Sequence, residues 1–147
     1  MIAKLRHVGI VVSDLDAAVR FYCGMLGLKI HQQKHETGRY LESLTGLEGA
    51  DATTIKLVAP DGNLVELLYF HSHPAVPRLN RQTSDVGISH IAFGVHNLEL
   101  AYKSLSDAGV RFHAPPQISP DGYAKVAYCM DFDGNILELV EVLNRNV

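Results

Sequence analysis

Two short phrases of the sequence each place a glutamate inside an otherwise apolar run. They are "DGNLVELL" and "DGNILELV", and their glutamates are Glu66 and Glu138. Two histidines precede apolar runs in the same way, His7 before "VGIVV" and His90 before "IAFGV". All four side chains are expected among apolar neighbours on strands that are central in their sheets. A carboxylate left unpaired there is costly, so each glutamate is expected to have a partner.

Two imidazoles and two carboxylates are the donor set of a borderline divalent ion such as Zn²⁺, Ni²⁺, Co²⁺, Fe²⁺ or Mn²⁺. The charge of the ion would also offset the two buried carboxylates. Taken singly, a glutamate on a strand is usually exposed, and a histidine near a strand start is usually a hydrogen-bonded residue. The joint occurrence of all four favours one divalent metal ion per chain, bound by His7, Glu66, His90 and Glu138.

An internal repeat accounts for the equivalent positions of these residues. Aligning "RHVGIVVSDLDAAVRFY" with "SHIAFGVHNLELAYKSL" places His7 on His90, and the two "DGN" phrases then coincide. A long segment with two prolines and little periodicity separates the copies. The chain is therefore predicted to be one domain, 1–147, built of module 1–70, linker 71–87 and module 88–143.

Each module is predicted to fold as βαβββ. Asp14 and Asn97 supply N-caps for the helices, and Gly27 and Gly109 lie where left-handed residues would end them. Apolar runs rich in β-branched residues, bounded by turn residues, predict the strands. These are 8–12, 28–33, 53–59 and 64–70 in the first module, and 88–95, 110–113, 125–131 and 136–142 in the second.

The first module is longer than the second, mainly because of an insertion at 35–51. A short helix is expected around 40–44 within it. Because the second module has no counterpart, a hypothesis follows that the insertion forms a lid over a substrate. Deleting it should then change substrate affinity and spare metal binding.

The composition limits the classes of protein to which the chain can belong. A formal charge of −3 provides no basic surface, so nucleic acid is not an expected partner. Apolar residues make up 47% of the chain, but no run is long enough to cross a membrane or serve as a signal peptide. A cytoplasmic protein is expected, with Cys23 and Cys129 as small buried residues in a reducing compartment.

The paired modules, with "LRHVGIVVSDLDAAVRFYCGMLGL", "GNLVELL", "SHIAFGV" and "DFDGNILELVE", resemble the vicinal oxygen chelate superfamily. Its members include glyoxalase I, methylmalonyl-CoA epimerase, extradiol dioxygenases, and fosfomycin- and bleomycin-resistance proteins. The resemblance implies an α+β fold whose curved mixed sheet surrounds a metal-containing cavity. It also implies ligands from the first and last strands of each module, which are His7, Glu66, His90 and Glu138.

Within the superfamily, a His/Glu/His/Glu set is similar to that of glyoxalase I. This implies an isomerase or lyase that moves a proton beside a metal-chelated carbonyl, with Glu138 or Glu66 as general base. A CoA-thioester epimerase and an extradiol-type dioxygenase are alternatives, although relatives of both kinds have fewer acidic ligands. A metal-free, ligand-sequestering protein of the bleomycin-resistance type is an alternative from another class. The resemblance also implies a homodimer and a small-molecule substrate with adjacent oxygens.

One departure from glyoxalase I concerns the glutathione part of its substrate. Glyoxalase I usually carries an arginine a few residues after its first ligand, but residues 8–12 contain no cation. Other polar residues expected near the cavity mouth are candidates for substrate contacts, although solvated loop side chains are an equal alternative for them. They are Arg39, Arg78, Tyr40, His71, His73 and Lys125.

Overall fold

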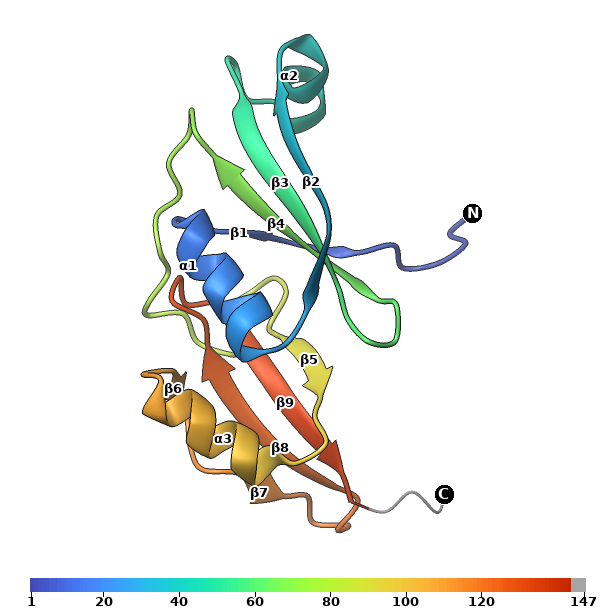
Figure 1. The fold of residues 1–147 in the computed structure, drawn as a ribbon, viewed down its shortest axis with the longest axis vertical. Coiled ribbons are helices and arrows are strands. Elements are labelled where there is room, and N and C mark those ends of the chain that lie inside the picture. Colours follow the sequence, from blue (N-terminus) through green and yellow to red (C-terminus); the bar gives the residue numbers. More distant parts are fainter. Residues whose placement is uncertain (144–147) are drawn as a thin grey trace. The chain divides into compact units, whose positions relative to one another are not determined.

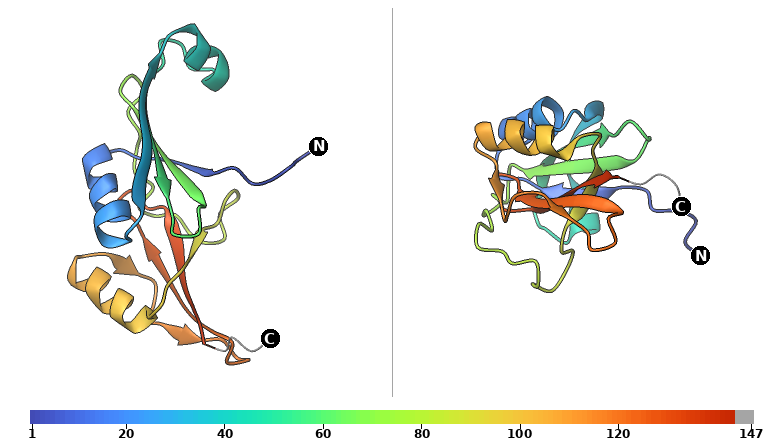
Figure 2. Two further views of the ribbon diagram at one scale, coloured as in Figure 1. Left: turned by 45° about the vertical axis from the view of Figure 1, so that its right-hand side comes forward. Right: turned by 90° about the horizontal axis from the view of Figure 1, so that it is seen from below.

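A computed structural model describes residues 1–143, and the chain divides into two compact units, residues 1–77 and 78–147. The predicted linker is thereby shared between the units. Each unit consists of a sheet with one or more helices (Figures 1 and 2). Among the described residues, no helix has both the length and the apolar character needed to cross a bilayer.

The first unit has a mixed four-stranded sheet in the order β1-β4-β3-β2. Strand β1 runs parallel to β4, and the other pairs are antiparallel. A helix leads from β1 to β2 and changes from α-helical to π-helical geometry along its length, and a second helix leads from β2 to β3. The elements are β1 (Val8–Val11), α1 (Leu15–Val19), η1 (Arg20–Met25), β2 (Lys29–Thr37), α2 (Arg39–Thr45), β3 (Asp51–Val58) and β4 (Leu64–Phe70).

The second unit repeats this plan, with the strand order β5-β9-β8-β6 and an extra short strand, β7, paired with β8. Strand β5 is parallel to β9, as β1 is to β4. The βαβββ prediction is confirmed, with the second strand of the plan, the one after the helix, split into the short strands β6 and β7. The elements are β5 (Ile91–Gly94), α3 (Leu98–Asp107), β6 (Arg111–Phe112), β7 (Gln117–Ile118), β8 (Ala124–Met130) and β9 (Ile136–Val142).

The helix starts agree with their predicted caps. The carboxylate of Asp14 accepts a hydrogen bond from the backbone N–H of Ala17 at 2.9 Å, and Asn97 accepts one from Leu100 at 2.9 Å. Both caps satisfy N–H groups that the first turn of a helix leaves without partners. Gly27 follows η1 with a φ of +80°, as predicted for the residue that ends this helix.

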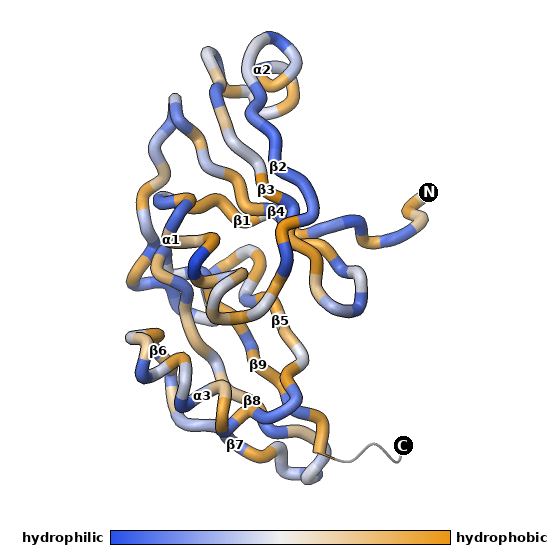
Figure 3. Tube along the Cα trace, viewed as in Figure 1, coloured by the Kyte–Doolittle hydropathy of each residue, from blue (hydrophilic) through white to orange (hydrophobic). Residues whose placement is uncertain are grey.

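Each unit has its own apolar core. In the first unit, Phe21 and Tyr22 of η1 are fully buried, together with Leu57 and Leu67 of the sheet. In the second unit the fully buried side chains include Leu98, Leu137 and Leu139. Figure 3 shows that β2 is largely hydrophilic, unlike β3 and β4. This fits its place at the sheet edge, where charged residues discourage pairing with another chain.

Two predictions about the strands need correction. Strand β2 continues to Thr37 and β3 begins at Asp51, so the ends of the predicted insertion 35–51 belong to the sheet. Only its middle leaves the sheet, as α2, which lies where a short helix was predicted. Leu41 of α2 is buried in an apolar cluster with Ala50 and Ala52, which fixes α2 to the sheet. The strands at His7 and His90 were expected to be central, but β1 and β5, which begin one residue after these histidines, are edge strands of their sheets.

The repeated "DGN" phrase forms the turn before β4 and β9. In the first copy, the backbone N–H of Asn63 donates to the Asp61 carboxylate at 3.0 Å, and Gly62 has a φ of +86°. In the second copy, Gly134 has the same φ of +86°. The turn chemistry explains "DGN" in the repeated phrase, and the glutamate that follows each turn lies in the strand itself.

Replacing Gly134 with alanine is expected to destabilise the protein more than replacing Gly62. Both positions have positive φ, which costs a non-glycine residue about 1–2 kcal/mol. A Cβ on Gly134 would also overlap the carbonyl oxygen of Arg78, whereas a Cβ on Gly62 would meet no atom within 4 Å. In urea unfolding, Gly134→Ala should lower the free energy of unfolding by roughly 1–3 kcal/mol more than Gly62→Ala does. Equal losses for the two variants would contradict the close contact.

Candidate metal centre

The first histidine–glutamate pair lies where β1 meets β4. The parallel register places Gly9 opposite Glu66, so His7, two residues earlier, projects from the same face of the sheet. Nε2 of His7 lies 3.3 Å from Oε2 of Glu66, with side-chain exposures of 30% and 14%. The two side chains therefore form a half-buried polar pair.

The second pair has the same construction in the other unit. Ala92 lies opposite Glu138 in the parallel pairing of β5 and β9, and His90 again precedes the strand by one residue. Nε2 of His90 lies 3.2 Å from Oε2 of Glu138, and the side-chain exposures are 30% and 20%. The duplication has preserved distance, atoms and burial, as well as residue types.

The neighbouring strand adds a different side chain to each pair. Lys56 of β3 lies opposite Glu66, and its Nζ is 3.3 Å from Oε1 of that glutamate. Tyr128 of β8 lies opposite Glu138. Neither residue was predicted from the sequence, although Lys56 and Tyr128 each precede the glutamate of their own module by ten positions. One glutamate thus has a cationic neighbour and the other a neutral one.

Tyr128 lies beside the Glu138 carboxylate and two histidine rings. Burial raises the pKa of its phenol, and the charge of Glu138 and a hydrogen bond to that carboxylate raise it further. The His90 ring meets the Tyr128 ring edge-on at a centroid distance of 5.1 Å, and His113 stacks on the tyrosine at 6.1 Å. Tyr128 is therefore a neutral group that holds both members of the second pair in place.

The histidine rings have few protein partners besides the glutamates. Among residues 1–143, Nδ1 of His7 is buried without a hydrogen-bond partner, and Nδ1 of His90 lies 3.2 Å from the Ser89 hydroxyl. A buried ring nitrogen without a hydrogen-bond partner is unusual, and among the described residues it occurs at His7 and not at His90. The two imidazoles and two carboxylates are donors of the types that borderline divalent ions prefer.

The other polar residues considered in the sequence lie elsewhere. Lys125 pairs with Glu99 of α3 at 3.2 Å, and Tyr40 on α2 is 71% exposed. Arg39 begins α2, Arg78 donates its backbone N–H to Asp133, and His73 contacts the Ser72 hydroxyl. None of these contacts involves the four predicted ligands. His71 belongs to a separate cluster with His35 and Asp51.

The two cysteines are free thiols. Cys129 is buried, as predicted, and burial raises the pKa of its thiol to about 12. Cys23 is only half-buried, and burial also raises the pKa of its thiol. Raised thiol pKa values disfavour the reactive thiolate, so neither cysteine has the properties of a nucleophile.

Comparison with known proteins gives a family and several relatives. The family model of the Glyoxalase/Bleomycin resistance protein/Dioxygenase superfamily matches residues 4–139. The lactoylglutathione lyase of Schizosaccharomyces pombe is 30% identical over 93% of the chain, which spans about half (47%) of that protein.

Two solved structures extend the comparison. A glyoxalase family protein from Bacillus cereus superposes with a TM-score of 0.88 at 22% identity, covering 98% of this chain and 97% of its own. The fosfomycin resistance protein FosX from Listeria monocytogenes, solved with Mn(II) and sulfate, has a TM-score of 0.63 at 16% identity, with 96% and 93% covered. At these identities the structures show the fold of the chain.

Proposed function

The chain belongs to the Glyoxalase/Bleomycin resistance protein/Dioxygenase superfamily, and on that premise we propose that it is a divalent-metal-dependent isomerase or lyase similar to lactoylglutathione lyase. The duplicated His–Glu pair carries this proposal. Two pairs with matching atoms, at 3.3 Å and 3.2 Å, supply the ligand set that the family resemblance implies. The name of the relative from Schizosaccharomyces pombe supports the type of reaction.

We propose that His7, Glu66, His90 and Glu138 together bind one divalent ion per chain. Four ligands of this type would leave two positions of an octahedron for adjacent oxygens of a substrate. When bound, the ion would polarise a substrate carbonyl and stabilise the negative charge that develops beside it. A metal-free binding protein would leave the half-buried carboxylates without a function.

In this proposal Glu138 is the general base. It takes a proton from the carbon next to the carbonyl and returns it to the neighbouring carbon. Glu66 is less suited to that part, because the ammonium group of Lys56 holds Oε1 at 3.3 Å. Glu138 faces the neutral phenol of Tyr128 instead, so it can move toward a substrate without breaking an ion pair with a lysine.

The proposed substrate class is small molecules with an oxygen on each of two adjacent carbons. The hemithioacetal of methylglyoxal and glutathione is the first compound to test, because it is the substrate type of a lactoylglutathione lyase. Residues 8–12 carry no cation for the glutathione carboxylate, so a weaker hold on glutathione is expected than in glyoxalase I. A homodimer remains an expectation from the family resemblance.

The test is turnover of this hemithioacetal by the full chain, loaded in turn with Ni²⁺, Co²⁺, Zn²⁺, Fe²⁺ and Mn²⁺. At least one metal form is expected to give thioester product with a kcat of about 1 s⁻¹ or more, since most enzymes fall in that range. Chelation should abolish the rate, and returning the metal should restore it. A chain that holds metal and yields no product with any of the five ions would contradict the proposal. Racemisation of a 2-methyl-branched CoA thioester by that sample would assign the alternative epimerase activity.

A further inference from the structure

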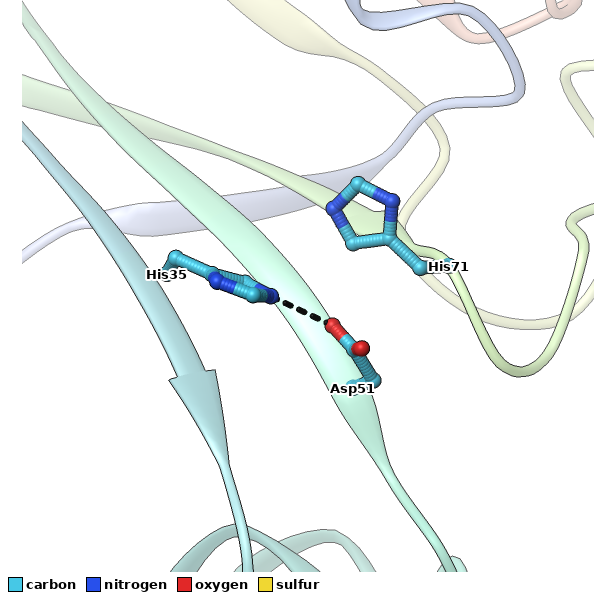
Figure 4. Close-up of side chains that lie close together, drawn as sticks. All are labelled: His35, Asp51 and His71. Atoms are coloured by element: carbon cyan, nitrogen blue, oxygen red, sulfur yellow. Dashed lines mark hydrogen bonds and ion pairs between the residues drawn. The ribbon is translucent and has the colours of Figure 1, made fainter.

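A second group of potential metal ligands lies at the far end of the first unit's sheet. It comprises His35 on β2, Asp51 at the start of β3 and His71 just after β4, shown in Figure 4. The ligand atoms of these three side chains all lie within 4.8 Å of one another. We propose that His35, Asp51 and His71 form a second binding site for a divalent transition-metal ion, separate from the duplicated His–Glu pairs.

The backbone register separates this cluster from Glu66. The ladder between β3 and β4 continues past Phe70, because the N–H of His71 donates to the Asp51 carbonyl at 2.8 Å. Side chains alternate across a strand, so His71 projects from the opposite face to Glu66. Tyr69 shares the face of His71, and their rings meet edge-on at 4.8 Å. The two groups of ligands therefore cannot share an ion.

The distances suit a single ion after small side-chain movements. Nε2 of His35 already lies 2.6 Å from Oδ1 of Asp51, and the rings of His35 and His71 have centroids 5.4 Å apart. Metal–ligand bonds of about 2.1 Å put the ligands of a tetrahedral ion about 3.4 Å apart. The ion would take the place of the hydrogen bond between His35 and Asp51. Shifts of about 1 Å would bring the third ligand into place.

Neighbouring groups hold the cluster in this arrangement. The hydroxyl of Thr53, a residue only 7% exposed, lies 2.9 Å from Nε2 of His71 and fixes the ring. The Ser72 hydroxyl accepts a hydrogen bond from the Asp51 backbone N–H at 2.9 Å. Such partners orient the ligands of protein metal sites. The three ligands come from adjacent chain segments, so the ion would clamp β2 and β3 to the residue that follows β4.

The donor types select the class of ion. Two imidazoles and one carboxylate favour Zn²⁺, Ni²⁺, Co²⁺ or Cu²⁺ over Mg²⁺ and Ca²⁺, which prefer oxygen ligands. The His35 side chain is 61% exposed and that of Asp51 40% exposed, so solvent reaches the site and water can complete the coordination.

The test uses the full chain with Glu66→Gln and Glu138→Gln, which removes ligands of the other proposed site. Zn²⁺ alone is titrated into the ¹⁵N-labelled protein, while calorimetry gives the affinity and NMR follows the histidine ring nitrogens. One equivalent of Zn²⁺ is expected to bind and to shift the ring signals of His35 and His71. His35→Gln and His71→Gln should each lower the affinity by at least about tenfold.

The matched control is His31→Gln, which changes an exposed histidine on the same strand and should leave the affinity unchanged. Should one ligand variant fail to fold, the other variant and the ring shifts in the parent decide the outcome. No Zn²⁺ binding, or binding that neither His35→Gln nor His71→Gln weakens, would overturn the second site. Either result leaves the proposed enzymatic function untouched, because the titration background already lacks Glu66 and Glu138.

Discussion

Exchanging both Glu66 and Glu138 for glutamine is expected to lower the affinity of the proposed four-ligand centre for a divalent metal ion by at least about 100-fold. The change removes two negative charges and two anionic ligands, and loss of even an outer partner of a metal ligand typically costs about 10- to 100-fold. Glutamine has the shape of glutamate, so the strands should keep their packing. Calorimetric titration with Ni²⁺ and Zn²⁺ measures the effect, and circular dichroism checks the fold.

The control for this variant changes two glutamates outside the centre, Glu48→Gln and Glu99→Gln, one in each unit. Both control residues are exposed, and Glu99 pairs with Lys125 at the surface. The control should therefore bind metal as the parent does. The proposed second site at His35 contributes its own binding event, so both variants are compared in the His35→Gln background. An unchanged affinity after loss of Glu66 and Glu138 would mean that these carboxylates are not ligands.

The single variant Glu138→Gln is expected to reduce kcat for the active substrate by about 10²- to 10⁴-fold, the usual contribution of a general base. Glutamine cannot accept the substrate proton. The fold-loss of kcat for Glu66→Gln should be at least about ten times smaller than the loss for Glu138→Gln. The reason is that Glu66 forms an ion pair with Lys56 and is proposed to act only as a ligand. The measurement is steady-state kinetics on protein saturated with metal, so that a lower metal occupancy is not mistaken for a slower proton transfer.

Two results would reverse these roles. A larger kcat loss for Glu66→Gln than for Glu138→Gln would make Glu66 the base, in spite of its lysine partner. Equal losses would indicate that both glutamates act only by holding the metal. Glu99→Gln again provides the matched control, since it removes a carboxylate from the second unit without touching either pair.

Much of the fold could be predicted from the sequence because the chain is duplicated. The last strand of each module, β4 and β9, begins and ends where predicted, because a "DGN" turn and a largely apolar run fix both strands. The helix starts followed from Asp14 and Asn97 for the same local reason. The pairing of each histidine with the glutamate of its own module was also accessible, since parallel first and last strands place them side by side.

The remaining features depend on contacts between segments that local patterns do not encode. Strand β2 extends to Thr37 through polar residues that have no apolar alternation, because pairing with β3 stabilises it at the sheet edge. Lys56 and Tyr128 became visible only through the strand register. The residues His35, Asp51 and His71 come from three segments of the chain. Asp51 and His71 meet only because the hydrogen bonds between β3 and β4 continue one residue past the end of β4.

We propose that the two His–Glu pairs bind one ion jointly. The most direct test is metal content by native mass spectrometry, in the His35→Gln background so that the proposed second site is absent. The parent of this series should carry one ion per chain, and changing either pair alone should remove it. The variants are His7→Gln with Glu66→Gln, and His90→Gln with Glu138→Gln. An ion that persists after one pair is changed would show that the pairs act separately, and would contradict the shared centre.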